Sequence, residues 1–419
     1  MVRLLSRARW VAPALLALGL HAAPLHAAPP PAAPAPLTLA QAFERAWERQ
    51  PQAQALTARR EAQAARQAAA TRWTPEPAAL ETSLRSDRLH QRQGSQEWEF
   101  GVAVPLWLPG ERARSQQLAD AEQGLLAAQT QAARWQLAGE LRERWWALHL
   151  AQATLQAAHQ RRDASQQLAA DVARRVQAGE LSRADLHQAQ AAAAAAAAEL
   201  AQASLRAQGA AQALRVLLGF GSEDTPVWAA DPEPEAPGTD PAPAHPWLDA
   251  LQAQAERARA SAALTRTQSR AHPELTLQQA RERGGRGEPR SGSVLFGLRL
   301  PLGEGAPHRA AVATAAAEQI EAEVGLARER ERLAADQHSA RAAVDAARQA
   351  LQQQHERARL LVETRSFYDR SFRLGETDLP TRLRIEQEAH SAEQDLARAR
   401  IELYLAIAQL HQALGLLPQ

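Results

Sequence analysis

The sequence contains an internal duplication that restricts the folds open to it. The stretches Phe100–Arg112 (FGVAVPLWLPGER) and Phe296–His308 (FGLRLPLGEGAPH) both begin with Phe-Gly and continue as an alternating apolar run that ends in Pro-Leu. In both, a glycine-bearing turn leads into a long Ala-rich segment. The same offset of 196 residues relates Gly179 to Gly375. A repeat of this length is a duplicated half-protein rather than a solenoid unit.

The duplication divides the chain into two structural repeats, residues 38–220 and 246–417, joined by a Pro-rich equatorial linker at residues 221–245. Each repeat is expected to run in the order helix, β-hairpin, long helix, helix. Because clustered prolines interrupt regular structure, we expect the linker to lie outside the helical body.

The composition excludes several kinds of site. The chain has no cysteine, so it has no disulfide, thiolate metal site, cysteine nucleophile or lipidated N-terminal cysteine. A net charge of +1 gives no electrostatic argument for nucleic-acid binding. Histidines are scattered singly, and no zinc-protease, phosphate-loop or serine-hydrolase motif occurs. We therefore predict no enzyme, no cofactor and no metal site.

The first 28 residues have the order of a secretory signal peptide. Arginines precede the apolar segment Val11–Leu20, and small residues follow it. That segment is too short to span a bilayer as a helix. We expect cleavage near Ala23 or Ala28 and a Pro/Ala-rich mature N-terminal segment at residues 29–37. The alternative is an uncleaved membrane anchor.

Each repeat also contains two segments in which apolar and polar residues alternate, the pattern of a β-hairpin. Polar loops separate the paired segments at Arg85–Ser95 and at Arg283–Arg290. The opposite face carries Glu97, Glu99 and Arg299. The apolar face, predicted to meet lipid, comprises Trp98, Phe100, Val102, Val104, Val294, Phe296, Leu298 and Leu300.

The remaining segments are predicted to be helical. Glu111–Ala178 and about Glu304–Leu374 would each span roughly 100 Å as helices. Small and apolar residues recur in them at the spacing of a coiled-coil seam, as at Leu141, Trp145 and Leu148. Helices this long need lateral partners, and shorter helices are expected beside them at Thr38–Thr71, Ser182–Leu218, Pro246–Arg270 and Asp378–Leu414.

The two predicted hairpins would leave sheet edges without a hydrogen-bonding partner. Four strands in one sheet have two unpaired edges. Strands of about ten residues with one apolar and one polar face are typical of outer-membrane β-barrels. In lipid every edge must pair, so several chains would share one barrel. The alternative is a soluble hairpin packed on helices.

With this arrangement the chain resembles the outer-membrane efflux channels typified by TolC. The resemblance extends from Thr38 to Leu417 and rests on the duplicated element order, the strand-to-helix exits at Pro105 and Pro301, and the helix turns near Gly179 and Gly375. The compact length and the PLWLPGER exit are most similar to the CzcC-type branch, which serves heavy-metal efflux. The resemblance implies a mainly α fold with a small β part. Long duplicated coiled-coil helices would form a trimeric α-barrel, and four strands per chain would contribute to a shared twelve-stranded transmembrane β-barrel.

The resemblance also implies a function. The chain would be a passive conduit in the outer membrane of a Gram-negative bacterium, with a periplasmic helical extension. It would form a homotrimer in outer-membrane lipid and would work with a periplasmic adaptor (membrane fusion) protein and an inner-membrane resistance–nodulation–division pump. Heavy-metal cations are the favoured substrate. The alternatives are organic-compound efflux, type I secretion, or a soluble periplasmic coiled-coil adaptor.

The turns between the paired helices are the predicted docking site and gate. Gly179 suits a left-handed helix stop, and Ser182 suits an N-cap with Asp185 three residues later. Under threefold symmetry the nearby carboxylates would form rings that favour cations, and arginines could pair with them to hold a closed state. Caps alone would account for Asp185 and Asp378. The predicted docking and gate residues are Gly179, Glu180, Ser182, Arg183, Asp185, Gly375, Glu376, Asp378 and Arg382.

Overall fold

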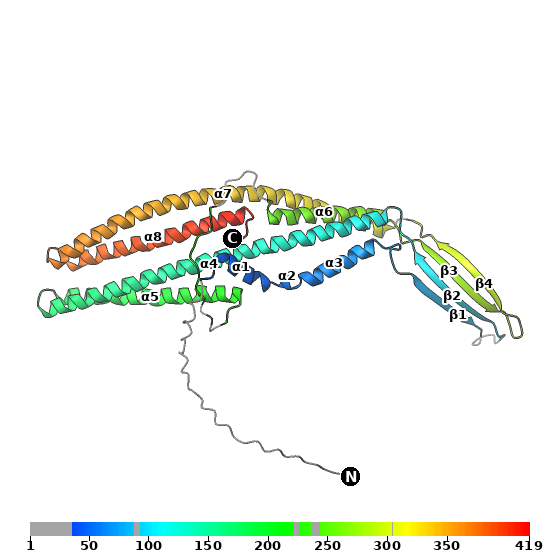
Figure 1. Ribbon diagram of the computed structural model, residues 1–419, viewed down its shortest axis with the longest axis horizontal. Coiled ribbons are helices and arrows are strands. Elements are labelled where there is room, and N and C mark those ends of the chain that lie inside the picture. Colours follow the sequence, from blue (N-terminus) through cyan, green and yellow to red (C-terminus); the bar gives the residue numbers. More distant parts are fainter. Residues whose placement is uncertain (1–35, 88–92, 222–223, 225, 236–243, 304) are drawn as a thin grey trace, which may run out of the picture.

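The computed structural model describes residues 36–87, 93–221, 224, 226–235, 244–303 and 305–419. The predicted signal peptide, most of the segment at residues 29–37 and part of the linker lie outside these residues. The described chain is an elongated helical body with a small sheet extending from one end and two helix turns at the other (Figure 1). This arrangement confirms the prediction of a mainly α fold with a small β part.

The sheet joins the two repeats. Its strands are β1 (Ala79–Ser86), β2 (Gln96–Pro105), β3 (Glu274–Arg283) and β4 (Ser291–Arg299). They are antiparallel in the order β1-β2-β3-β4, so both predicted hairpins are confirmed, and β2 and β3 pair across the repeats. The outer edges of β1 and β4 have no partner within the described chain.

The first repeat begins with three short helices, α1 (Leu39–Glu48), α2 (Pro51–Gln54) and α3 (Leu56–Ala70). The prediction of one continuous helix from Thr38 to Thr71 is therefore wrong. Pro51 is the cause, since its ring disfavours a helical conformation at the preceding residue, and Gln50 is extended with ψ at 137°. The predicted cap is confirmed: the Gln41 amide N–H donates to the Thr38 hydroxyl at 3.3 Å.

The remaining helices follow the predicted plan. They are α4 (Glu111–Gln177), α5 (Arg183–Leu218), α6 (Pro246–Thr267), α7 (Ala306–Arg373) and α8 (Leu379–Ala413). In each repeat shorter helices pack along a long one, α5 on α4 and both α6 and α8 on α7, while α6 and α8 also contact α4 across the repeats. Helix α6 ends three residues before the predicted Arg270. Gln268 leaves the helix with ψ at 54°, and its side chain donates to the Glu111 carboxylate instead.

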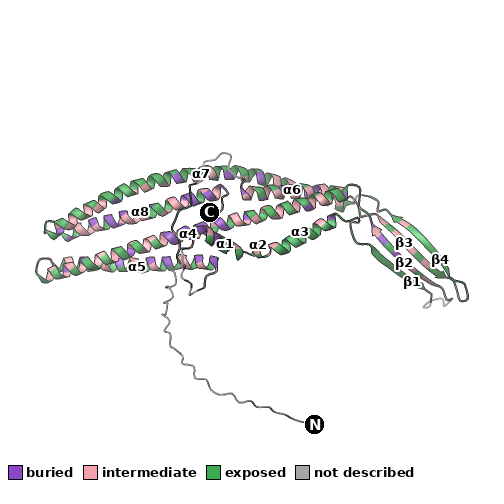
Figure 2. Ribbon diagram, in the orientation of Figure 1, coloured by how far each residue is buried: buried purple, intermediate pink, exposed green. Residues whose placement is uncertain are grey.

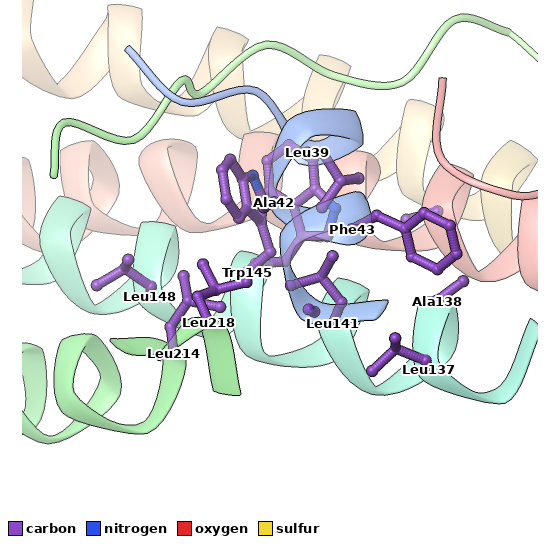
Figure 3. Close-up of a cluster of buried hydrophobic side chains, with 13 residues drawn as sticks. Leu39, Ala42, Phe43, Leu137, Ala138, Leu141, Trp145, Leu148, Leu214 and Leu218 are labelled. Carbon is purple, nitrogen blue, oxygen red and sulfur yellow. The ribbon is translucent and has the colours of Figure 1, made fainter. Parts of the chain in front are cut away.

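The core is a thin seam rather than a globular centre (Figure 2). Its thickest part lies where α1, α4 and α5 meet (Figure 3). There Leu141, Trp145 and Leu148 are each at most 1% exposed, which confirms the predicted seam. Along α5 and α8 many of the buried residues are alanines, and their small side chains let neighbouring helices approach closely. None of the helices in the described ranges combines the length and the hydropathy needed to cross a membrane.

The prediction that the linker lies outside the helical body is wrong for its described residues. Its described residues 226–235 run against the helical body instead of lying outside it. Trp228 packs edge-on against Trp145 of α4 with ring centroids 5.7 Å apart, and it forms an isolated bridge with Leu37. Glu233 is 6% exposed. The proline content breaks secondary structure here, but it does not prevent burial when the core offers a partner.

Candidate functional site

The sheet has two chemically distinct faces. Successive strand residues point to opposite faces, and direct cross-strand partners share a face. The register Leu80–Val102–Leu277–Phe296 therefore sets one row of an apolar face. The residues predicted to meet lipid share this face on β2 and β4, and Leu300 follows directly after β4.

The apolar face is exposed in the single chain. Phe296 is 76% exposed and Phe100 is 51% exposed, and the rings of Trp98 and Phe100 stack at 6.2 Å. Val104, near the helical body, is half-buried. A large exposed apolar surface marks a site of contact with another apolar phase or molecule.

The opposite, polar face is laterally bonded. Arg85 pairs with Glu97 at 2.9 Å, and the Ser83 hydroxyl donates to Glu99 at 2.6 Å. Near the helical body Arg299 lies 3.5 Å from Glu274. These groups suit contact with water, so the sheet has one face for water and one for a medium without it.

The first strand exit, at Pro105, is followed by a buried carboxylate that the sequence analysis did not identify. Past Pro105, Gly110 adopts φ of 79° and starts α4 at Glu111, whose side chain is fully buried. Its carboxylate accepts from the Leu108 amide at 3.0 Å and from Gln268 at 2.8 Å, and it lies 3.0 Å from Nε2 of His272. Burial by itself raises the pKa of Glu111, but these hydrogen bonds outweigh it, so the pKa lies below its usual value.

Because these contacts join the start of α4 to the segment before β3, Glu111 links the two repeats at the base of the sheet. Pro307 stands at the equivalent position of the second repeat, so the device occurs once. The other predicted exit, Pro301, lies just beyond β4.

A second buried cluster lies mid-body. The Arg142 guanidinium donates to both oxygens of Glu233 at 2.9 and 2.7 Å, and His411 Nδ1 lies 3.4 Å from the same carboxylate. Burial by itself raises the pKa of Glu233. The hydrogen bonds from His411 and Arg142 lower the pKa by more than burial raises it, so it lies below its usual value. The cluster joins α4, the linker and α8. A lone arginine in an apolar seam signals an acidic partner, but nothing near it in the sequence identifies Glu233.

The two helix turns lie together at the far end of the body (Figure 1). Gly179 and Gly375 have φ of 80° and 78°, as a left-handed helix stop requires. Ser182 and Asp185 form a capping box. In the second turn Thr381 N–H donates to Asp378 at 3.1 Å, and hydrogen bonds from the Thr381 side chain and backbone lower the pKa of Asp378.

The charged residues at these turns are not all free to act together. Glu180, Arg183 and Glu376 are exposed. Arg382 instead binds Asp369 of α7 at 2.5 Å and lies 4.6 Å above the Phe372 ring. In this structure Arg382 therefore does not pair with the turn carboxylates, as the latch hypothesis supposed, because a carboxylate on the neighbouring helix is closer.

Comparison with known proteins agrees with this geometry. The family model of the outer membrane efflux proteins matches residues 43–220, which is nearly all of the first repeat. No curated protein matches the chain. Among solved structures, VceC of Vibrio cholerae aligns with a TM-score of 0.72 and 17% identity over 90% of this chain and 96% of that chain.

Two further channels align over the same share of this chain. CmeC of Campylobacter jejuni gives a TM-score of 0.72, 14% identity and coverage of 90% of this chain and 85% of that chain. MtrE of Neisseria gonorrhoeae gives a TM-score of 0.69 and 16% identity, and the alignment covers 90% of this chain and 89% of that chain. The fold is that of an outer-membrane efflux channel. It is a fold of transport conduits rather than of enzymes.

Proposed function

We propose that this chain is the outer-membrane channel subunit of a tripartite efflux system. The observation that carries the proposal is the sheet: one exposed apolar face, one polar face and two unpaired edges, at the end of a long helical body. A sheet with free edges cannot sit in lipid alone, since each unpaired backbone group there is costly. Pairing the β4 edge with the β1 edge of a second copy removes that cost.

Three copies would give a closed barrel of twelve strands. The polar face with its glutamates would line the lumen, and the apolar face would meet lipid. The helical bodies would then pack side by side around a continuous channel. Exposed apolar residues on the outside of the single chain support such packing, for example Leu205 on α5 and Ile320 on α7.

The direction of the channel follows from its shape. The helices extend from one end of the sheet only, so they would lie in the periplasm, with the hairpin loops toward the exterior. The signal peptide predicted at residues 1–28 fits that location. The helix turns at Gly179 and Gly375 would meet a periplasmic adaptor, which connects the trimer to an inner-membrane resistance–nodulation–division pump.

We propose heavy-metal cations as the substrate, on the basis of the resemblance to the CzcC-type branch. The exposed carboxylates Glu180 and Glu376 support passage of cations, because rings of carboxylates favour them in pores. A deletion strain should become sensitive to metal salts and recover with the wild-type gene. Sensitivity to organic compounds alone, or loss of a secreted protein, would instead favour the other services of this type of channel.

The conduit itself is tested separately from its cargo. The full chain, expressed with its N-terminal segment, should fractionate with the outer membrane and give single-channel currents after reconstitution. Recovery in the soluble periplasmic fraction, without channel activity, would overturn the proposal and favour the adaptor alternative.

A further inference from the structure

The charged residues of the sheet are divided unevenly between its faces. The register places Arg85 and Arg299 on the polar face, where both are paired. On the apolar face the charged residues of the four strands are Arg281 and Arg283, and no carboxylate of these strands lies there. The five strand carboxylates all share the polar face: Glu81, Glu97, Glu99, Glu274 and Glu282.

Arg281 has a distinctive position on the apolar face. Its direct cross-strand partners are Trp98 on β2 and Gly292 on β4. A side chain built at Gly292 would meet only the Ala280 carbonyl oxygen, at 3.9 Å, so the backbone beside Arg281 is bare. Arg290, two residues before Gly292, is also exposed.

The two arginines have no counter-charge of their own. Arg281 is exposed, and neither it nor Arg290 has an ion pair with any residue that the structure describes. The neighbouring Arg283 differs, since it donates to the Gly94 carbonyl oxygen at 3.3 Å. If this face meets lipid, where water does not solvate the guanidinium, an unpaired arginine needs an anion from outside the chain.

The height of the pair on the sheet identifies that anion. Leu300 to Gly292 spans roughly 27 Å along the strand, or about 20 Å along the membrane normal at the usual tilt of roughly 35–45°, against an apolar band of about 25 Å in an outer-membrane barrel. A long arginine side chain at that row can reach the few remaining ångströms to the headgroups. Trp98 therefore stands where aromatic residues meet the membrane interface. The row of Arg281 lies at the end of the sheet away from the helices, which in the proposed channel would be close to the outer headgroups.

We propose that Arg281 and Arg290 bind a headgroup phosphate of an anionic outer-leaflet lipid over the bare backbone of Gly292, with Trp98 beside the lipid. A guanidinium binds phosphate through two parallel hydrogen bonds. The site lies on one chain, so a trimer would hold three. This inference rests on the proposed function, because it requires the apolar face to lie in the membrane.

The test uses the purified full-length channel in detergent and two probes, lipid A with two phosphate groups and the same glycolipid without phosphate. Lipid retained per chain is counted by native mass spectrometry. Wild type should retain the phosphorylated form preferentially. Each arginine removed should weaken binding about fivefold, so Arg281→Gln with Arg290→Gln should weaken it about 25-fold. Arg85→Gln makes the same charge change at the same height on the polar face, and should leave retention unchanged.

The lipid site would be overturned if wild type retained the two glycolipids equally. It would also be overturned if the double variant retained as much of the phosphorylated glycolipid as wild type does. Displacement of the lipid by millimolar inorganic phosphate would show a free-phosphate site and would also overturn it. Channel currents recorded on the same preparations separate the two proposals. A conducting trimer without selective lipid retention refutes this inference alone, whereas a chain that forms no channel refutes the proposed function.

Discussion

At the scale of single residues, neighbours along one strand occupy opposite environments. Val102 on the apolar face is 41% exposed, whereas Ala103 beside it is 5% exposed. Contact of Val102 with water is unfavourable, and the other residues of its row, Leu80, Leu277 and Phe296, are apolar as well. Lipid would bury that row, and this gives the first prediction.

Val102→Arg should destabilise the membrane-inserted channel by about 2–4 kcal/mol, since an arginine at the midplane of the bilayer must lose its hydration. Ser83→Arg is the control, because Ser83 lies on the polar face next to Glu99. Urea unfolding of both variants in lipid vesicles measures the difference. A cysteine at position 102 that reacts freely with a water-soluble maleimide would contradict the lipid assignment.

Glu233→Gln should lower the free energy of unfolding by about 3–5 kcal/mol, because it leaves the buried Arg142 without a counter-charge. The matched control is Glu235→Gln two residues later. Glu235 is 78% exposed and pairs with the exposed Arg348, so its loss should cost less than about 1 kcal/mol. Chemical denaturation followed by far-ultraviolet circular dichroism compares the two. Equal effects would show that the buried pair does not stabilise the fold.

Glu111 predicts a pH dependence. Its pKa in the folded chain lies below the usual 4.5, so the carboxylate stabilises the fold fully above that value and stops doing so as the pH falls through the folded pKa. Glu111→Gln should therefore be less stable than wild type at pH 7. The difference in thermal midpoint between wild type and Glu111→Gln should become smaller as the pH drops below 4.5. A gap that stays constant with pH would mean that the ionised form has no special role.

At the scale of elements, the two helix turns are similar in backbone and different in side chains. Both use a left-handed glycine and a polar N-cap. The second has Pro380 in the first turn of α8 and exposes Leu374 at 69%. Below them Phe372 packs with Leu168 and Val172 of α4, so the two turns are held together at their base. An adaptor would therefore meet two different surfaces from each chain.

The turn carboxylates that do not cap a helix give the prediction at this scale. Glu180→Gln with Glu376→Gln should lower the cation preference of single channels and leave trimer stability unchanged, because both side chains are exposed and rings of charge act on ions in the pore. Reversal potentials in a salt gradient measure the preference. Ser182→Ala is the converse control, since it removes a cap and keeps every charge. Unchanged reversal potentials in the double variant would limit the turns to a structural or docking role.

At the scale of the whole molecule, the single chain exposes surfaces that an assembly would cover. Ile320 and Val324 lie one turn apart on α7 and are 60% and 52% exposed. Together with the free edges of β1 and β4, they support the proposed trimer, in which other copies would cover them. Both features point to lateral contact around a closed ring.

The detergent-extracted protein should therefore have the mass of three chains. Ile320→Asp with Val324→Asp should shift it toward monomer without loss of helix content, because the charges would be buried between subunits but are solvated in the free chain. Light scattering and circular dichroism together measure mass and fold. A monomer that conducts in a bilayer would refute the shared barrel.

Local patterns were enough to predict most elements. The period of two in β2 and β4, the seam around Leu141 and the caps at Thr38, Ser182 and Asp378 each depend on residues a few positions apart. The break at Pro51 had a local signal too, because a proline disfavours a helical conformation at the residue before it. The period of two also predicted which strand residues share the apolar face, because successive strand residues point to opposite faces.

The sequence by itself determined the duplicated architecture, because each half repeats the same order of helix-forming and strand-forming segments. Only the tertiary structure decided which charges are buried and with whom. Glu233 meets Arg142 and His411, and Glu111 meets His272, across separations of 91 to 178 residues. Arg382 binds Asp369, 13 residues earlier on the neighbouring helix, rather than a turn carboxylate. Such pairs form where distant segments are brought together by packing, and no periodicity along the chain records which partner will be nearest.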